Sequence, residues 1–223
     1  MQPDRKAKIL IVDDHPIVRQ GIAMLINREP GLDACCEASD AQQAIAANLA
    51  CPHDLAIVDL SLAGASGLEL VKQLRAKFHG LAILMMSMHD EAVYAERALR
   101  AGAHGYLMKQ EATATMLTAI GVILRGELYV SDRMRSRLLQ QKLNGDSAAS
   151  PIAGLTASEF EVLNLIGTGL GTSEIADRLK RSVKTIESHR ANIRKKLNLR
   201  SGNELARFAI NWVNGSAIGA PPA

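Results

Sequence analysis

Five polar side chains in the first half of the chain follow short apolar runs, and their types suit phosphoryl-transfer chemistry. They are Asp13, Asp14, Asp59, Ser87 and Lys109. Clustered carboxylates favour Mg²⁺, which prefers oxygen ligands, and an ionised Asp beside the ion is a competent nucleophile toward phosphorus. The ammonium and the hydroxyl could bind further phosphoryl oxygens. Taken singly, an Asp after a strand is most often a helix cap, so only the joint pattern predicts a site.

These side chains can meet only if the elements before them are strands of one sheet. Continuous apolar runs, typical of strands buried on both faces, predict strands at 8–13, 33–38, 55–60, 81–87 and 105–109. Amphipathic stretches predict helices at 17–27, 41–49, 67–77, 91–101 and 112–125. The alternation predicts an α/β fold with a five-stranded, doubly wound parallel sheet of order 2-1-3-4-5. The five side chains would then converge at the carboxyl ends of the strands, where such sheets bind ligands.

Four motifs in this half resemble the receiver domain of two-component response regulators, over about residues 6–126. They read "IVDDHP", "VDLSLAGASGLEL", "LMMSMHD" and "GAHGYLMK". The resemblance implies that Asp59 is the phosphoacceptor. It also implies that Asp14, Asp59 and the backbone carbonyl of Ser61 bind Mg²⁺ directly, with Asp13 acting through water.

The same resemblance implies switch roles for three residues. Ser87 would close on the phosphoryl group, Lys109 would pair with it, and Tyr106 would change rotamer on activation, although Tyr106 could instead be a simple half-buried strand aromatic. The sequence departs from the family at Ala63 and Gln110, where proline is usual. These departures predict a looser loop after the phosphoacceptor and a less rigid lysine, but they remove no chemical group.

Charge is unevenly distributed along the 223 residues. Residues 1–150 carry 16 Lys or Arg and 17 Asp or Glu, whereas residues 151–223 carry 10 and 6. Residues 178–200 alone hold nine basic residues against the single acid Glu187. Such a basic segment suits a polyanionic partner and predicts a second domain with a different role.

The basic segment has the pattern of a helix-turn-helix in a smaller, all-α domain. Short helices would follow the N-caps Thr156, Ser182 and Ser201, and the helix at 183–197 places apolar and polar residues on opposite stripes. This helix follows a short helix and a tight turn, which together make a helix-turn-helix. The motif would place the helix at 183–197 in the major groove. The predicted DNA-facing residues are Lys184, Thr185, Glu187, Ser188, Arg190, Ala191, Arg194 and Lys195.

These residues divide by what they could contact. The four basic residues and Thr185 suit phosphates, which position the helix without reading sequence, and the small Ser188 and Ala191 permit close approach. Glu187 could accept a hydrogen bond from a cytosine amino group or orient a neighbouring Lys.

Three stretches of this half are similar to the LuxR-type DNA-binding domain: "LTASEFEVLNLI", "SEIADRL" and "SVKTIESHRANIRKKLNLRS". A receiver joined to this module is the arrangement of NarL/FixJ-type response regulators. The resemblance implies a transcription regulator rather than an enzyme, with a receiver at 6–126, a linker helix and flexible linker at 127–154, and the DNA-binding domain at 155–214. Its partners would be a sensor histidine kinase, double-stranded DNA and, when phosphorylated, a second copy of the chain, with RNA polymerase as a further candidate.

Two other functions remain open to the sequence. A Mg²⁺-dependent phosphohydrolase would use the same Asp nucleophile, but it needs a second acid two residues later, where Ser61 stands. A regulator that works without phosphate, through DNA and protein contacts alone, would not need the five-residue cluster.

The remaining features predict a cytoplasmic protein. No apolar run is long enough to span a membrane, and the first residues lack a signal-peptide pattern. Cys35, Cys36 and Cys51 show no metal-ligand spacing in the sequence. They are expected to be buried small apolar residues in a reducing compartment.

Overall fold

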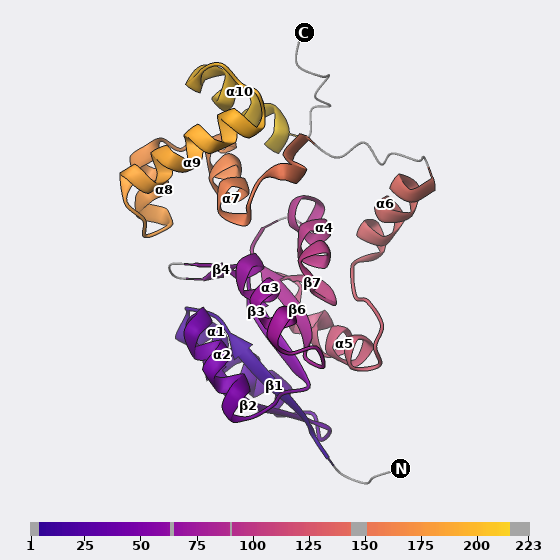
Figure 1. Ribbon diagram of the computed structural model, residues 1–223. Coiled ribbons are helices and arrows are strands. Elements are labelled where there is room, and N and C mark those ends of the chain that lie inside the picture. Colours follow the sequence, from indigo (N-terminus) through magenta and orange to yellow (C-terminus); the bar gives the residue numbers. More distant parts are fainter. Residues whose placement is uncertain (1–4, 63–64, 90, 144–150, 215–223) are drawn as a thin grey trace. The chain divides into compact units, whose positions relative to one another are not determined.

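The computed structural model describes residues 5–62, 65–89, 91–143 and 151–214 (Figure 1). The described residues up to 143 belong to one compact unit and those from 151 to another. None of the described helices is both long and apolar enough to cross a membrane.

The first unit is built on one sheet of five parallel strands. The strands are β1 (Ala7–Val12), β2 (Leu32–Ala38), β3 (Leu55–Asp59), β6 (Ala82–Ser87) and β7 (Gly105–Met108). They lie in the order β2-β1-β3-β6-β7 (Figure 1), which confirms the predicted topology, and their ends fall within one residue of the predicted ones. The apolar runs set these bounds, since Ile9, Leu10 and Ile11 are fully buried although they face opposite sides of the sheet.

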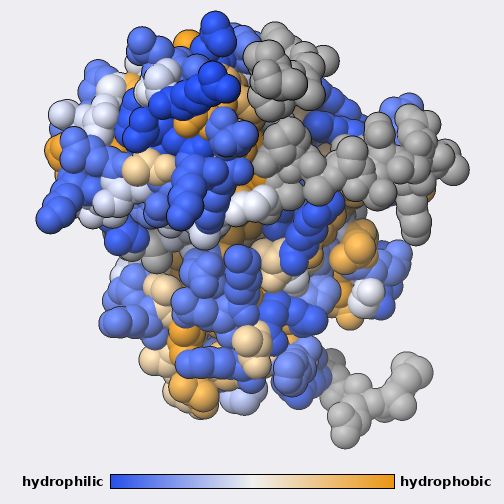
Figure 2. Space-filling view, turned by 45° about the horizontal axis from the view of Figure 1, so that its top comes forward, coloured by the Kyte–Doolittle hydropathy of each residue, from blue (hydrophilic) through white to orange (hydrophobic). Residues whose placement is uncertain are grey.

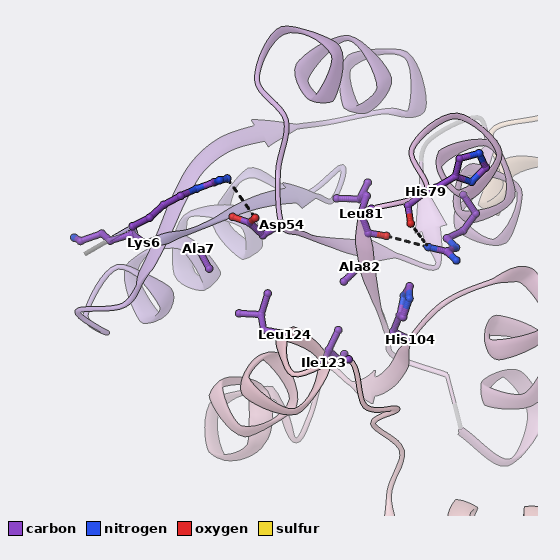
Figure 3. A pocket seen from close by; sticks show the side chains of 13 residues that line it. Lys6, Ala7, Asp54, His79, Leu81, Ala82, His104, Ile123 and Leu124 are labelled. Atoms are coloured by element: carbon purple, nitrogen blue, oxygen red, sulfur yellow. Dashed lines mark hydrogen bonds and ion pairs between the residues drawn. The ribbon is translucent and has the colours of Figure 1, made fainter. Parts of the chain in front are cut away.

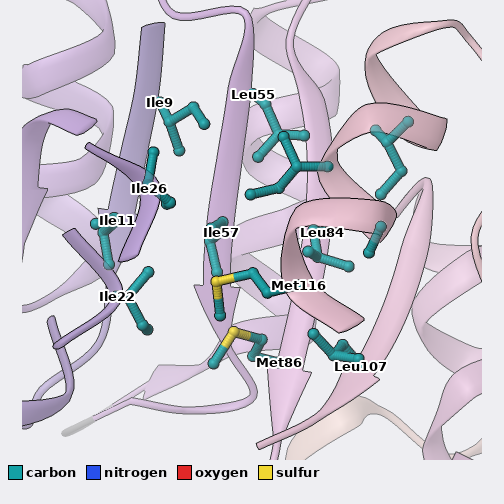
Figure 4. Packing of buried hydrophobic residues seen from close by; sticks show 13 residues of the cluster. Ile9, Ile11, Ile22, Ile26, Leu55, Ile57, Leu84, Met86, Leu107 and Met116 are labelled. Atoms are coloured by element: carbon teal, nitrogen blue, oxygen red, sulfur yellow. The ribbon is translucent and has the colours of Figure 1, made fainter. Parts of the chain in front are cut away.

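Five helices cover the two faces of this sheet, as predicted. They are α1 (Pro16–Ile26), α2 (Ala41–Ala50), α3 (Gly67–Lys77), α4 (Glu91–Ala101) and α5 (Ala112–Leu124). One buried cluster joins a face of the sheet to α1 and α5, with Ile22 and Met116 beside Ile57 (Figure 4). Alternate strand residues such as Leu10 and Val58 are buried on the opposite face, where α2, α3 and α4 lie.

A short ribbon that the sequence did not predict follows Asp59. The strands β4 (Ser61–Leu62) and β5 (Ala65–Ser66) pair antiparallel, and α3 then begins at Gly67. A Cβ atom at Gly67 would lie 2.1 Å from the main-chain oxygen of Asp59, so only glycine fits where the ribbon returns to the end of β3. The expected looseness at Ala63 concerns a residue outside the described ones.

Helix α6 (Asp132–Leu143) packs on α4. Ser131 caps it, because the Ser131 Oγ accepts a hydrogen bond from the Met134 N–H at 3.1 Å. The same hydroxyl donates to Glu91 Oε1 at 2.5 Å, and Arg137 donates to the main-chain oxygen of Ala92 at 2.9 Å. The predicted linker helix therefore contacts α4, whereas residues 144–150 of the predicted flexible linker lie outside the described residues.

The second unit is all-helical. It consists of the 3₁₀ helix η1 (Pro151–Gly154) and of α7 (Ala157–Gly167), α8 (Thr172–Arg178), α9 (Val183–Lys196) and α10 (Gly202–Val213). The predicted N-caps are confirmed: Thr156, Ser182 and Ser201 each accept a hydrogen bond from the backbone N–H three residues later. Phe160 and Ile186 are fully buried.

The predicted burial of the three cysteines is wrong. Cys35 is exposed, Cys36 and Cys51 are half-buried, and all three are free thiols. Because β2 is an edge strand of the sheet (Figure 1), it has a neighbouring strand on one side only, and part of it stays open to solvent.

Candidate phosphoacceptor site and DNA-binding helix

The residues predicted from the first half of the chain meet at the carboxyl edge of the sheet. Asp13 follows β1, Asp59 ends β3, Ser87 ends β6 and Lys109 follows β7. The Lys109 Nζ lies 2.6 Å from Asp13 Oδ2 and 2.8 Å from Asp59 Oδ2. These two carboxylates are only 2% and 4% exposed, so one ammonium offsets two buried charges that would otherwise repel each other.

The acidic residues form a compact set of oxygen donors. Carboxylate oxygens of Asp13, Asp14 and Asp59 and a nitrogen of His15 all lie within 4.8 Å of one another. Oxygen donors at this spacing fit a hard cation such as Mg²⁺. His15 was not predicted from the sequence as a member of this cluster, although its Nδ1 lies 3.2 Å from Asp13 Oδ1 and 2.8 Å from Asp14 Oδ1. Its position directly after Asp13 and Asp14 in the sequence could have indicated that it lies beside their carboxylates.

Burial changes the protonation of the site. It raises the pKa of Asp59 to about 6, against the opposing effects of Lys109 and of a backbone hydrogen bond from Ser61, while the charge of Asp13 pushes in the same direction as burial. Burial alone would lower the pKa of Lys109, but the hydrogen bonds and charges of Asp13 and Asp59 raise it overall. The ammonium is therefore charged at neutral pH.

Asp59→Asn should stabilise the metal-free protein at neutral pH. Between the unfolded pKa of 3.8 and the folded value of about 6, the folded state holds a proton that the unfolded state has lost. The free energy of unfolding of the wild type therefore falls as pH rises through this window, by up to about 3 kcal/mol. Urea unfolding in EDTA should show the variant to be more stable at pH 7.5 and little different at pH 4. An equal difference at both values would contradict the raised pKa.

A hydrogen-bond network surrounds the end of β6. The Ser87 Oγ accepts from the backbone N–H of His89 at 2.9 Å, and the buried Tyr106 hydroxyl donates to the His89 carbonyl at 2.9 Å. The His89 Nε2 lies 3.5 Å from the Ser61 Oγ. His89 was not predicted from the sequence, and it joins two of the three predicted switch residues, Ser87 and Tyr106, through its backbone. The backbone N–H of Lys109 donates to the Ser87 carbonyl at 2.7 Å.

A groove of about 510 Å³ lies at the other edge of the sheet (Figure 3). Its lining includes Lys6, Asp54, Leu81 and His104, each of which comes just before a strand. It therefore opens at the amino ends of the strands and contains none of the predicted site residues.

Helix α9 carries every predicted DNA-facing residue. Ile186 and Ile193 are buried on one side, and the eight predicted residues are exposed or half-exposed. Lys196 is different, since its Nζ lies 2.6 Å from the buried Glu159 Oε2 and it serves the domain's own packing. Hydrophilic residues dominate the face of the molecule in Figure 2, where hydrophobic ones are scattered.

Family comparisons match both units. Residues 9–121 match the response regulator receiver domain, and residues 153–209 match the bacterial regulatory proteins of the luxR family. The oxygen regulatory protein NreC of Staphylococcus carnosus is 34% identical, over 91% of this chain and 96% of its own length.

Solved structures give the same result. RcsB from Salmonella enterica serovar Typhimurium, bound to the promoter rprA with the phosphomimetic BeF3⁻, is 27% identical over 92% of this chain and 99% of its own, with a TM-score of 0.59. A LuxR-family two-component response regulator from Aurantimonas sp. SI85-9A1 is 34% identical over 62% of this chain and 99% of its own, with a TM-score of 0.58. The chain therefore belongs to the NarL/FixJ-type response regulators, transcription regulators in which a receiver domain controls a LuxR-type DNA-binding domain.

Proposed function

We propose that Asp59 accepts a phosphoryl group from a sensor histidine kinase in the cytoplasm and that the phosphorylated chain binds promoter DNA as a homodimer. One observation carries this proposal: the Lys109 ammonium joins Asp13 and Asp59 at the carboxyl edge of the sheet. A cation held there can pair with a phosphoryl oxygen once Asp59 is modified. The family favours this regulator over the phosphohydrolase alternative.

Each residue has a distinct part in the proposed transfer. An Asp59 carboxylate oxygen attacks phosphorus, and the phosphohistidine nitrogen leaves with the electron pair of the P–N bond. Lys109 then pairs with one phosphoryl oxygen, and the Ser87 hydroxyl donates to another. Tyr106 would change rotamer when Ser87 closes on the phosphoryl group, because both side chains are hydrogen-bonded to the backbone of His89.

We assign Mg²⁺ to Asp14, Asp59 and the Ser61 carbonyl, with Asp13 acting through water. When bound, the ion supplies charge neutralisation for the phosphoryl oxygens. Asp14→Asn, which removes one anionic ligand and keeps the side-chain shape, should weaken Mg²⁺ binding about tenfold or more. Calorimetric titration of Mg²⁺ checks this, with Asp132→Asn as the control because its side chain is 95% exposed. Equal affinities in both variants would exclude Asp14 as a ligand.

We propose three functional segments along the chain, which accept the phosphoryl group, connect the domains and bind DNA. The receiver occupies 6–126, the linker helix and flexible linker 127–154, and the DNA-binding domain 155–214. RcsB dimers on DNA among the similar structures support a dimer here, since two helix-turn-helix units on adjacent half-sites reinforce each other's binding. RNA polymerase is a further proposed partner, which the DNA-bound regulator would contact at the promoter.

Phosphorylation should raise DNA affinity by roughly tenfold or more, because it couples two binding units. Operator binding and oligomeric state should be measured for the full-length protein with and without acetyl phosphate and Mg²⁺, for Asp59→Asn, and for the fragment 151–223. Asp59→Asn should stay at the unphosphorylated level, and the fragment should bind weakly with steep salt dependence. If phosphorylation changes neither DNA affinity nor oligomeric state, the proposed coupling of phosphorylation to dimerisation and DNA binding is wrong.

A further inference from the structure

A second group of metal-ligating side chains lies in the first unit, outside the acidic cluster. The sulfur atoms of Cys35 and Cys36 and one imidazole nitrogen of His53 all lie within 4.8 Å of one another. Neighbouring strand residues normally face opposite sides of a sheet. Here the register between β1 and β2 shifts: Lys8 pairs with Asp33 and Leu10 with Cys36. One extra residue in β2 is a β-bulge, which redirects side chains and explains how two adjacent thiols approach the same histidine.

His53 is held in the state that a metal ligand requires. Its backbone N–H and its ring Nδ1 lie 3.1 Å and 2.9 Å from Asn48 Oδ1. Because the backbone N–H can only donate, this atom is the carbonyl oxygen of Asn48, and the ring proton must be on Nδ1. The lone pair is therefore on Nε2. A metal-bound histidine typically has its other nitrogen fixed in this way.

The buried, unsatisfied Nε2 atom of His53 is a second and independent indication of a ligand at this group. His53 is only 6% exposed, and its Nε2 is buried with no hydrogen-bond partner among the described residues. A buried acceptor left unsatisfied destabilises the folded protein, and a bound cation at Nε2 would remove that cost. Burial also lowers the pKa of His53, so the ring is neutral and able to bind a cation.

We propose that Cys35, Cys36 and His53 form a binding site for Zn²⁺. Thiolate and imidazole ligands favour this borderline-soft cation, whereas the carboxylates at the other site favour a hard one. Ligands about 2.0–2.3 Å from zinc stand roughly 3.5–3.8 Å apart in a tetrahedron, so the group needs only a small contraction. Each cysteine releases its thiol proton to solvent as its Zn–S bond forms. The exposed side of Cys35 leaves the fourth position open to water.

This site is separate from the phosphoacceptor. His53 comes before β3 and Asp59 ends it, so the two sites lie toward opposite edges of the sheet and failure of one proposal leaves the other intact. A bound ion would tie β2 to the connection between α2 and β3. Cys51 belongs to neither site: its Sγ accepts a hydrogen bond from the Lys8 ammonium at 3.3 Å.

The test uses full-length protein, reduced with a phosphine and kept in excess Mg²⁺ so that the acidic site is filled. Zn²⁺ affinity is measured by competition with a chromophoric chelator, and Co²⁺ serves as a spectroscopic probe. We expect one equivalent of tightly bound Zn²⁺ and thiolate-to-Co²⁺ charge-transfer bands, which carboxylates cannot produce. Cys35→Ser and His53→Gln should lose both, and Cys51→Ser should keep both.

Asn48 acts as a positioning residue. Asn48→Ala should weaken Zn²⁺ binding about 10- to 100-fold, while Asn48→Asp, which keeps an acceptor oxygen, should restore it. Alkylation of the wild type provides a measurement that needs no variant to fold: Zn²⁺ should protect Cys35 and Cys36 but not Cys51. The absence of thiolate bands, equal alkylation of all three cysteines with and without Zn²⁺, or equal loss of affinity in Cys51→Ser would each overturn the assignment.

Discussion

Asp59→Asn will abolish the phosphate adduct that acetyl phosphate and Mg²⁺ form on the wild-type protein. The amide has no anionic oxygen to attack phosphorus. The neighbouring Asp13 cannot replace it readily, because both of its carboxylate oxygens are engaged, Oδ1 by His15 and Oδ2 by Lys109. Intact mass spectrometry should therefore show one phosphate on the wild type and none on the variant.

The control for this experiment is Asp132→Asn, which makes the same chemical change at a side chain that is 95% exposed. It should be phosphorylated like the wild type. A phosphate adduct of equal yield on Asp59→Asn would show that another residue is the acceptor, and peptide mapping would then identify it.

Lys109→Met tests the same site from the cationic side. It removes the charge that joins Asp13 and Asp59 and leaves two buried carboxylates facing each other. Loss of one oriented charge at the transferring group typically costs about 10²-fold in rate, so the adduct should form far more slowly. Saturating Mg²⁺ should restore part of the rate, since it offsets the same repulsion.

The sequence allowed the main features of this site to be predicted because they depend on strand ends. Each apolar run stops at a polar residue, and parallel strands bring those residues to one edge. Asp13, Asp59, Ser87 and Lys109 therefore followed from pattern alone. The contacts of His89 with Ser87 and Tyr106 could not be predicted, since they run through its backbone N–H and carbonyl, which every residue type has.

Other features depend on register and on contacts across the fold, which no local pattern encodes. All three cysteines were expected to be buried because their residue type usually is. For Cys35 and Cys36, the edge position of β2 and its bulge opposite Lys8 and Leu10 determine the exposure, whereas Cys51 follows α2. The ribbon of β4 and β5 is too short for a period of two to be visible. The need for glycine at position 67 arises from the main chain of Asp59, which only the folded structure brings close.

Ser188→Glu in α9 is expected to lower operator affinity by roughly 100-fold, or about 3 kcal/mol. Ser188 is exposed, and its hydroxyl donates to the Lys184 carbonyl at 3.0 Å, so its small side chain stays close to the helix. It shares the polar stripe with Lys184, Ala191 and Lys195. A carboxylate there would face the phosphate backbone at the point of closest approach. In a dimer each half-site bears this repulsion.

The matched control is Ser158→Glu, which adds the same charge at a half-exposed position of α7, outside the two helices of the motif. It should bind DNA nearly as the wild type does. Lys195→Ala gives a contrasting result, because a phosphate contact carries no sequence information. It should weaken binding to all sequences alike and lower the slope of log affinity against log salt by about one. If Ser188→Glu and Ser158→Glu weaken binding equally, α9 does not approach DNA through this stripe, and the effect of Ser188→Glu comes from overall charge.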